Sequence, residues 1–302
     1  MHKTPAVYVW LMAALIYSPI CIGQQTTYPV APGAKLQLVS DHFAFTEGPT
    51  ADAAGNVYFT DQPNNRIWKY DTANQLTVYK ENAGRANGMY FDRHNNLYVC
   101  ADEHNQLWRI NAGGTTDTLV RLLQGRLLNG PNDVWVSANG NVYLTDPYYK
   151  RDYWPADRPA ASTRMVLLLR KGKQPLEVMD STLQQPNGIT GTPDGKYLYV
   201  SDLQAGKTWR YRINKKGRLT EKQLFVAQGS DGMTTDAAGN VYLCGNGVTV
   251  YNAAGQKIQH IPVPAQWTAN VCFGGKNRNV LFITAGTSLF TLQMTIKGVG
   301  GK

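Results

Sequence analysis

The chain has 302 residues, of which 43% are hydrophobic, and it carries 29 glycines and a formal net charge of +9 at pH 7. This hydrophobic content supports a packed core and excludes wholesale disorder. The positive residues are scattered and accompany no recognisable nucleic-acid-binding motif, so we expect no nucleic-acid partner.

The first 23 residues differ from the rest and have the pattern of a secretory signal peptide. A positively charged start is followed by an apolar run over residues 6–16, and the small residue Gly23 marks the expected cleavage point. The run is short for a membrane span and Pro19 interrupts it, which disfavours an anchor that stays attached. We therefore expect an exported protein, periplasmic or secreted, with one domain over residues 24–302 and no membrane span after cleavage.

A short strand motif of the type Asn-Val-Tyr recurs six times along this domain. Aligned on their third residue, the copies are spaced by 40, 45, 56, 43 and 39 residues, and the aligned residues are Tyr58, Tyr98, Tyr143, Tyr199, Tyr242 and Leu281. Gly-Asn and similar turn pairs separate the apolar runs, which favours tight hairpins. Six units of this length, each with several short strands, predict an all-β fold, a six-bladed β-propeller.

The two ends of the domain are predicted to close the ring. The sixth unit stops after its third strand and lacks an outer one, whereas the alternating segment at residues 35–40 precedes the first unit and belongs to none. We expect this N-terminal strand to complete the sixth unit, because an open ring would expose sheet edges. An α/β fold is the alternative, but the chain has no amphipathic segment long enough to provide its helices.

The longest spacing, between the third and fourth units, contains an insertion rich in Tyr, Trp and Pro at residues 147–162. A segment of this composition predicts an ordered flap and not a loose linker. Tyr149 and Trp154 on the flap are candidates to cap a ring-shaped substrate, although the flap could equally do no more than pack against the ring.

A residue with a side-chain oxygen stands 11 or 12 positions before each aligned strand residue. These residues are Glu47, Asn87, Asn132, Asn187, Asp231 and Asn270. Equivalent positions of a propeller lie on one ring, so the side chains are expected to converge at the mouth of the central channel. Oxygen donors without His or Cys suit a hard cation, Ca²⁺ first and Mg²⁺ or Mn²⁺ second. For any single copy an ordinary Asn-Gly or Asp-Gly turn is the alternative, and for Asn87 and Asn270 the two interpretations are balanced.

Five motifs, taken in order, carry a resemblance to a known family. They are Thr46-Glu47-Gly48-Pro49, Leu128-Asn129-Gly130-Pro131-Asn132-Asp133-Val134, Thr145-Asp146-Pro147, Gln185-Pro186-Asn187-Gly188-Ile189 and Ser230-Asp231-Gly232-Met233. Over residues 45–284 the chain resembles the senescence-marker-protein/gluconolactonase/luciferin-regenerating-enzyme-like family, near bacterial gluconolactonases. The resemblance implies a six-bladed propeller with a divalent metal at the top of the channel, often Ca²⁺, with Mg²⁺, Mn²⁺ or Zn²⁺ as alternatives.

The same resemblance implies site residues. The metal ligands of the family match Glu47, Asn187 and Asp231, and Asn132 matches a residue that is a ligand or lies next to the metal and substrate. The animal branch has an Arg that contacts sugar two residues before that Asn. Here the position is Gly130, so the sugar-lactone specificity of that branch is not carried over.

A metal at this position implies hydrolysis of a lactone such as gluconolactone, or of a similar cyclic ester, with a small molecule as the partner. A carbonyl bound to the ion becomes more electrophilic, and the same charge stabilises the oxyanion. Asp231 would then be a ligand that also acts as general base for water or attacks directly. His104, on a loop facing the same mouth, and Asp146, beside the insertion, are further candidates for substrate contacts, although for His104 an exposed loop residue without a role is the favoured interpretation.

Two rival functions share the predicted site. The first is a phosphotriesterase or broad esterase that uses the same ion. The second is a non-catalytic propeller that binds a ligand or partner and holds the metal as a structural plug, because a fold alone does not decide function.

The cysteines do not indicate a disulfide framework. Three remain after the predicted cleavage, Cys100, Cys244 and Cys272, and an odd number cannot be fully paired. A bridge between Cys244 and Cys272 is left open.

Overall fold

The structure, a computed structural model, describes residues 1–2, 28–158, 163–171 and 175–299. The signal peptide expected at residues 1–23 lies almost wholly outside this part of the chain. Within the described residues, no helix is long and apolar enough to cross a membrane.

A carboxylate-capped turn joins the first two strands of a blade. In the first blade, the Asp52 carboxylate accepts hydrogen bonds from the backbone N–H of Asn56 at 2.9 Å, from its Nδ2 at 2.7 Å and from the Tyr58 hydroxyl at 3.3 Å. Corresponding contacts recur in later blades, between Asp92 and Asn96 and among Asp236, Asn240 and Tyr242. The Asn-x-Tyr pattern of the sequence therefore marks a turn that satisfies its own polar groups and fixes the hairpin register.

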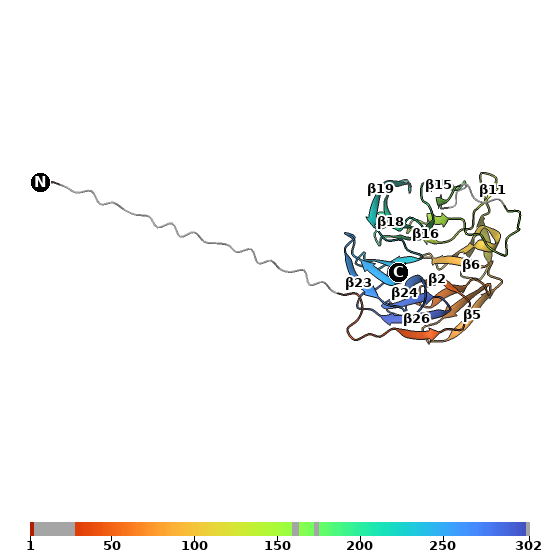
Figure 1. Cartoon of the computed structure of the whole chain (residues 1–302), viewed down its shortest axis with the longest axis horizontal. Coiled ribbons are helices and arrows are strands. Elements are labelled where there is room, and N and C mark those ends of the chain that lie inside the picture. Colours follow the sequence, from red (N-terminus) through yellow and green to blue (C-terminus); the bar gives the residue numbers. More distant parts are fainter. Residues whose placement is uncertain (3–27, 159–162, 172–174, 300–302) are drawn as a thin grey trace.

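Six four-stranded antiparallel sheets are arranged around a central axis, as Figure 1 shows. The first blade contains β2 (Thr46–Ala51), β3 (Val57–Asp61), β4 (Arg66–Tyr70) and β5 (Leu76–Glu81). The second contains β6 (Ala86–Phe91), β7 (Leu97–Ala101), β8 (Gln106–Ile110) and β9 (Thr116–Val120). The third contains β12 (Val134–Val136), β13 (Val142–Asp146), β14 (Met165–Leu169) and β15 (Glu177–Asp180).

The remaining blades follow the same order of strands from the axis outward. The fourth contains β16 (Pro186–Gly191), β17 (Tyr197–Asp202), β18 (Lys207–Ile213) and β19 (Leu219–Val226). The fifth contains β20 (Met233–Thr235), β21 (Val241–Gly245), β22 (Gly247–Tyr251) and β23 (Lys257–Ile261). The sixth contains β24 (Thr268–Gly274), β25 (Val280–Ala285), β26 (Ser288–Gln293) and, at its edge, β1 (Gln37–Ser40).

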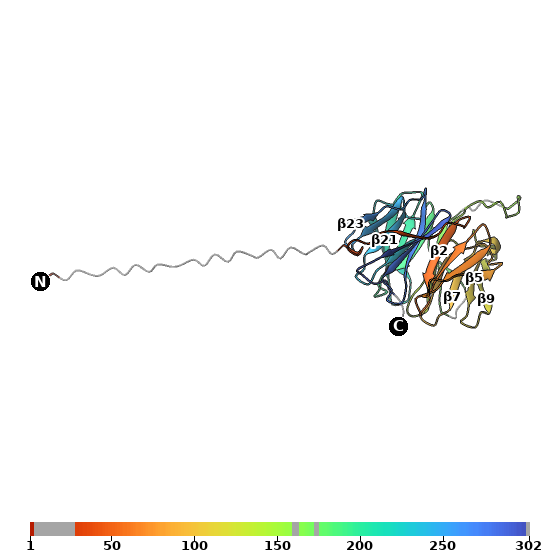
Figure 2. The same cartoon turned by 90° about the horizontal axis from the view of Figure 1, so that it is seen from below.

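The ring is closed as the sequence predicted. Strand β1 pairs with β26 in antiparallel register, so the N-terminal strand completes the blade that the C-terminal part begins. The inner strands β2, β6, β12, β16, β20 and β24 lie next to one another in this order, and β24 returns to β2. Figure 2 shows the ring from the side. The predicted six-bladed β-propeller is therefore confirmed.

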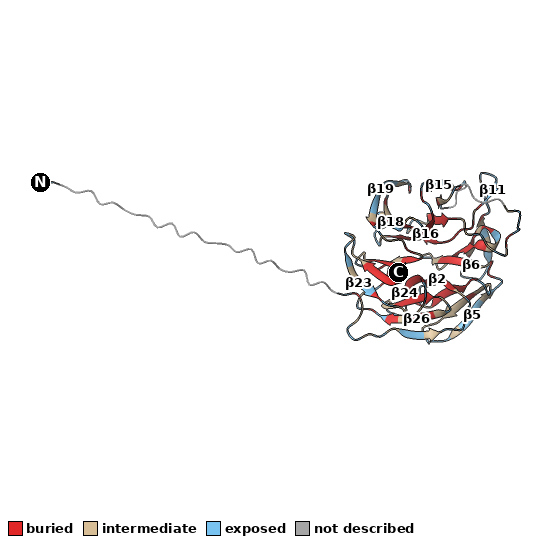
Figure 3. Ribbon diagram, viewed as in Figure 1, coloured by how far each residue is buried: buried red, intermediate tan, exposed pale blue. Residues whose placement is uncertain are grey.

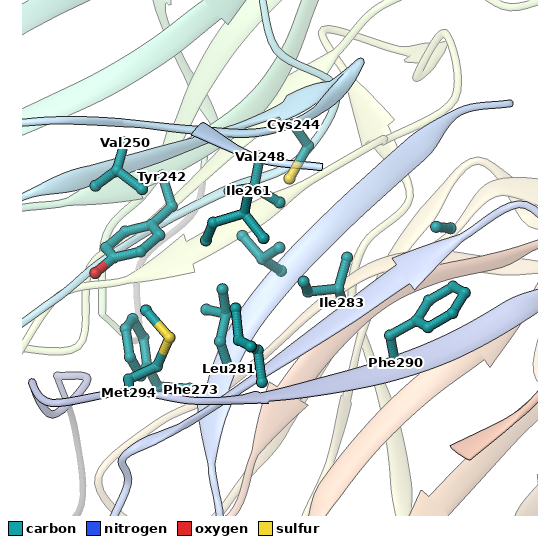
Figure 4. Close-up of a cluster of buried hydrophobic side chains, with 13 residues drawn as sticks. Tyr242, Cys244, Val248, Val250, Ile261, Phe273, Leu281, Ile283, Phe290 and Met294 are labelled. Carbon is teal, nitrogen blue, oxygen red and sulfur yellow. The ribbon is translucent and has the colours of Figure 1, made fainter. Parts of the chain in front are cut away.

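Apolar side chains pack between neighbouring blades, while the outer strands face solvent. Figure 3 shows buried strands around the axis and more exposed strands such as β5 and β19 at the rim. Figure 4 shows one interblade cluster, in which Tyr242 and Ile261 of the fifth blade meet Phe273 and Leu281 of the sixth. Each large apolar side chain buried in this way contributes roughly 2 kcal/mol relative to its exposed state.

Two short elements fall outside the predicted pattern. A single 3₁₀ turn, η1 (Asp102–His104), follows β7, and a small hairpin of β10 (Leu122–Leu123) and β11 (Arg126–Leu127) precedes the third blade. Cys100, Cys244 and Cys272 are buried free thiols, so no bridge joins Cys244 to Cys272.

Candidate metal centre

Backbone irregularities direct polar side chains toward the axis at the start of the inner strands. In four of these strands the pairing with the second strand slips by a residue at this point, between Glu47 and Thr50, Ala86 and Met89, Pro186 and Ile189, and Thr268 and Asn270. A bulge of this kind leaves a residue outside the regular alternation and re-aims its side chain. The polar residues therefore begin each strand without disturbing the apolar pattern of the blade behind them.

Glycines next to these polar residues let neighbouring inner strands approach closely. A Cβ at Gly48 would lie 2.1 Å from the carbonyl oxygen of Asn87, and a Cβ at Gly188 would lie 2.2 Å from that of Asp231. No side chain fits at these distances, so Asn87 lies beside Glu47 and Asp231 lies beside Asn187. This close approach explains why Gly follows the polar residue in four of the six units.

The third and sixth blades, which face each other across the ring, carry a side chain where the other blades have that Gly. The N–H of Gly88 donates to the Asn132 carbonyl at 2.7 Å, and the N–H of Gly232 donates to the Ala269 carbonyl at 2.6 Å. Ala269 is therefore the equivalent of Asn132, and Asn270 is the equivalent of Asp133. The expectation that Asn270 is the sixth ring residue is wrong by one position.

Asp133 and Asn270 fill the space that the glycines leave. A Cβ at Gly88 would lie 2.3 Å from Asp133 Oδ1, and a Cβ at Gly232 would lie 1.8 Å from the Asn270 carboxamide. Asn270 Oδ1 accepts the N–H of Val271 at 2.8 Å, and its Nδ2 donates to Glu47 Oε2 at 3.0 Å. Asn270 therefore orients Glu47 and has its own oxygen occupied.

Three carboxylates, Glu47, Asp133 and Asp231, are enclosed near one another. Burial raises the pKa of Glu47 well above its ordinary value, and the charges of Asp231 and Asp133 raise it further. Burial raises the pKa of Asp133 to about 7 and that of Asp231 to about 6. In the part of the chain that the structure describes, no Lys or Arg forms an ion pair with any of the three. No Lys or Arg of the described protein therefore compensates these carboxylates when they ionise.

Two neighbours orient the half-buried Asp231 and the buried Asn187. The indole N–H of Trp267 donates to Asp231 Oδ2 at 2.6 Å. The Asn187 Nδ2 donates to the Tyr149 hydroxyl at 2.8 Å, and the same amide lowers the pKa of Asp231 by hydrogen bonding. The Asn187 nitrogen is therefore occupied, which leaves Oδ1 as the atom able to bind a cation.

The donor set fits a hard divalent cation. Asn87 Oδ1 is buried without a hydrogen-bond partner in the described structure, which is costly unless a ligand from outside the protein binds it. Both hydrogen bonds described for Glu47 go to Oε2, so Oε1 is left for another partner. Among the described residues no three His, Cys, Asp or Glu side chains are close enough to hold a metal by themselves, so Asn oxygens have to complete the set.

The insertion connects the second blade to the site. Asp102 Oδ2 accepts Arg151 Nε and the Tyr153 hydroxyl, both at 2.7 Å, and the Asp102 carbonyl accepts the Trp154 indole N–H at 3.2 Å. A Cβ at Gly130 would lie 2.7 Å from Asp102 Oδ1 and 2.9 Å from the Trp154 ring. The flap therefore occupies the space that a side chain at residue 130 would need.

Two of the predicted substrate contacts, Asp146 and Trp154, are buried and already occupied by protein groups. Asp146 is fully buried, and its two carboxylate oxygens accept the N–H groups of Asn129 and Gly130 at 3.0 Å. Asp146 therefore holds the loop that leads to Asn132 and is not exposed to a substrate, which corrects the prediction. Trp154 is 8% exposed and the Arg158 guanidinium covers its ring at 3.5 Å, so it packs and does not cap a ligand.

Tyr149 and His104 remain as the other predicted contacts. The Tyr149 hydroxyl accepts a hydrogen bond from Asn187 Nδ2, and its contact with a substrate stays a prediction. His104 has a half-exposed side chain that stacks on Trp108 with centroids 5.5 Å apart, and its role stays a prediction.

Sequence reasoning did not select Asp133, Trp267, Asp102 or Arg151 as site residues. Asp133 was within reach, because it directly follows Asn132 in one of the motifs. The other three lie in loops outside the repeated spacing, so the sequence carries no periodic signal for them.

The model of the SMP-30/Gluconolactonase/LRE-like region matches residues 45–287 of the chain. The chain is 26% identical to the gluconolactonase of Zymomonas mobilis over 289 residues, which cover 85% of this chain and 81% of that protein. The structure of XC5397 from Xanthomonas campestris, described as a gluconolactonase, has a TM-score of 0.80 and 28% identity over 88% of this chain and 91% of that one. A calcium-binding protein, regucalcin, from Agrobacterium tumefaciens shares the fold, with a TM-score of 0.73 and 19% identity over 88% of this chain and 95% of that one.

Proposed function

The chain belongs to the SMP-30/Gluconolactonase/LRE-like family, and from this premise we propose that it is a metal-dependent hydrolase that opens a lactone ring. The relatives described as gluconolactonases support a sugar lactone or a similar cyclic ester as substrate. One observation carries the proposal: Glu47, Asp133 and Asp231 are enclosed together without a cationic partner in the described structure.

Four side chains would hold the cation. Glu47, Asn187 and Asp231 supply one oxygen each, and Asn132 stands at the equivalent position of the third blade. The unpartnered Oδ1 of Asn87 supports a further direct or water-mediated contact. Ca²⁺ suits this set best because it accepts six to eight oxygen ligands in flexible geometry, and the calcium-binding relative is consistent with that choice.

A bound cation would supply Lewis-acid polarisation of the lactone carbonyl and stabilise the negative charge that develops on its oxygen. Asp231 would be oriented for this reaction by the hydrogen bond that Trp267 donates to its Oδ2. A carboxyl group with a pKa of about 6 is mostly ionised at pH 7, so Asp231 can accept a proton from water or attack the carbonyl itself.

The experiment is a hydrolysis panel on metal-free protein. Aldonolactones, aliphatic lactones, aryl esters and a phosphotriester are each offered with chelator alone and with Ca²⁺, Mg²⁺, Mn²⁺ or Zn²⁺. We expect hydrolysis of at least one sugar lactone only when a cation is present.

Two other outcomes would favour one of the rival functions. Cation binding without turnover of any lactone or ester would make the protein a non-catalytic binding propeller. Phosphotriester turnover that exceeds that of every lactone would favour the esterase rival.

Export is proposed together with this activity, because residues 1–23 have the composition of a cleaved signal peptide. N-terminal sequencing of the mature protein from the producing cells tests it. A start near residue 24 supports export, and an intact Met1 contradicts it.

A further inference from the structure

Arg151 reaches the site from the flap, and the protein uses one edge of its guanidinium. Its Nε donates to Asp102 Oδ2 at 2.7 Å, whereas no hydrogen bond of Nη1 or Nη2 is found among the described residues. The side chain is 24% exposed. The planar group is therefore held through its Nε, and its terminal pair of N–H donors is available to a ligand.

The position of Arg151 places this free edge beside the candidate metal centre. The guanidinium lies over the Tyr149 ring, 5.4 Å from its centroid, and the hydroxyl of that ring accepts a hydrogen bond from Asn187. Arg151 is therefore separated by one aromatic ring from a proposed metal ligand.

Asp102 makes this placement rigid. The carboxylate is 2% exposed and, besides Arg151, it accepts hydrogen bonds from the Tyr153 hydroxyl at 2.7 Å and from Gln62 Nε2 at 3.3 Å. The Trp154 indole N–H donates a hydrogen bond to the backbone carbonyl of Asp102. All three hydrogen bonds of the carboxylate go to Oδ2, so this oxygen is occupied by the protein and holds the guanidinium in one orientation.

A second arginine of the flap provides a contrast. Arg158 stacks on Trp154, and its terminal nitrogens donate to the carbonyls of Leu128 and Asn129 and to Asn105 Oδ1. Its donors are thus occupied by the protein, while its positive charge adds to that of Arg151. Among the described flap residues, Arg151 therefore differs from Arg158 in keeping terminal N–H donors available for an anion.

We propose that Arg151 determines specificity by binding a carboxylate substituent that the lactone carries away from the bond to be broken. This inference rests on the proposed function. The terminal N–H pair of a fixed guanidinium matches the two oxygens of a carboxylate, whereas a hydroxyl group meets it through one oxygen. The substrate class is therefore a sugar lactone that still bears an acid group after ring closure.

The experiment measures binding without turnover. Calorimetry compares a ring-opened monoacid, gluconate, with the corresponding diacid, glucarate, on Ca²⁺-loaded wild-type protein and on Arg151→Gln. We expect wild type to bind the diacid about 10-fold more tightly, since one charge-assisted pair of hydrogen bonds is worth about that factor, and Arg151→Gln to bind both acids equally. Thermal unfolding shows whether the variant is folded.

Arg158→Gln is the matched control, because it removes the same charge and loosens the flap while the Arg151 edge remains. Arg158→Gln should bind both acids more weakly, by the same factor, and keep the preference for the diacid. The proposal is overturned if the diacid does not bind wild type, if wild type does not prefer it, if Arg151→Gln keeps the preference, or if Arg158→Gln loses it.

A parallel kinetic assay separates this inference from the proposed function. The ratio of kcat/KM between the lactone with and the lactone without the carboxylate should show the same preference and the same loss in Arg151→Gln. A binding preference without hydrolysis of either lactone supports the role of Arg151 and contradicts the lactonase proposal. Hydrolysis of both lactones without any preference contradicts the role of Arg151 and supports the lactonase.

Discussion

The two faces of the propeller contain the same residue types in very different surroundings. On the face with the hairpin turns, the Asp236 carboxylate accepts hydrogen bonds from the backbone and side chain of Asn240 and from a tyrosine hydroxyl. At the channel mouth, Glu47 and Asp231 repel each other, and Asn87 Oδ1 has no partner in the described structure. Protein groups therefore satisfy the hydrogen-bonding capacity of the turn carboxylates, whereas the polar groups at the channel mouth need a bound ligand.

This difference distinguishes structural from functional polar residues better than residue type does. Buried polar groups are almost always hydrogen-bonded, and a buried cluster that is not compensated costs stability. Such a cluster persists where a ligand compensates it, so the uncompensated face is the candidate site.

Removing one carboxylate from each face gives the largest expected contrast. Asp231→Ala should lower kcat/KM for the lactone by about 10³-fold or more, because it removes both a ligand and the reacting carboxylate. Asp236→Ala should leave kcat/KM unchanged and lower the free energy of unfolding by about 1–3 kcal/mol. Initial rates at saturating Ca²⁺ and denaturant unfolding measure the two effects, and the contrast fails if folded Asp236→Ala is equally inactive.

Ca²⁺ should raise the free energy of unfolding by binding at the channel mouth, whereas the turn carboxylates offer it no site. At a concentration about 100 times Kd, binding adds about 2.7 kcal/mol, which corresponds to a rise in Tm of about 5–10 °C for a domain of this size. Glu47→Gln should lose the rise, because it removes a charged ligand. A scan with chelator and with Ca²⁺ tests this, and an unchanged Tm at millimolar Ca²⁺ would count against a cation site.

The metal-free protein should lose stability as the pH rises. Asp133 and Asp231 have pKa values of about 7 and about 6 when folded, above the value of about 4 in an unfolded chain. The folded state therefore binds more protons between about pH 4 and pH 7, so the free energy of unfolding falls as the pH rises through this window.

Thermal unfolding in chelator from pH 4.5 to 8 measures this slope. The fall in Tm should be about 5 °C or more, smaller in Asp133→Asn, and smaller again with Ca²⁺, which compensates the ionised carboxylates. A Tm that rises steadily over the range would contradict the enclosed cluster.

Trp267→Phe should produce the smallest effect. It removes the hydrogen bond to Asp231 Oδ2 and keeps most of the ring, so kcat should fall about 10-fold with little change in Ca²⁺ affinity. Trp68→Phe is the control, because the Trp68 indole N–H is buried without a partner among the described residues, so its loss removes no hydrogen bond found there. Equal activity of the two variants would show that the indole does not position Asp231.

The fold was predictable because its turns repeat. Each Asn-x-Tyr strand follows a turn whose geometry depends on residues within seven positions, as Asp52, Asn56 and Tyr58 show. Local contacts of this kind leave a regular spacing in the sequence. Ring closure was predictable because the last unit lacks an outer strand and the N-terminal segment supplies one.

The ring of polar residues was predictable except where the backbone slips by one residue. Counting from the second strand placed Asn270 with Glu47, but the register shift between Thr268 and Asn270 moves Ala269 to that position. Asp133 was missed because the count from the second strand selects its neighbour Asn132, and the residue that follows the selected one is a glycine in four of the other units. Trp267 and Arg151 come from loops that no repeat constrains, so contacts formed in three dimensions alone reveal them.

The central claim is that the channel mouth holds a cation that lactone hydrolysis requires. Its most direct test is a calcium titration of the metal-free protein in which acid release from a sugar lactone and calcium binding are recorded together. We expect no hydrolysis above background in chelator and a rate that rises with Ca²⁺ and saturates as one Ca²⁺ binds per chain, and we expect Glu47→Gln to lose both the binding and the hydrolysis. Full hydrolysis in chelator, or saturation of the site without any hydrolysis, would contradict it.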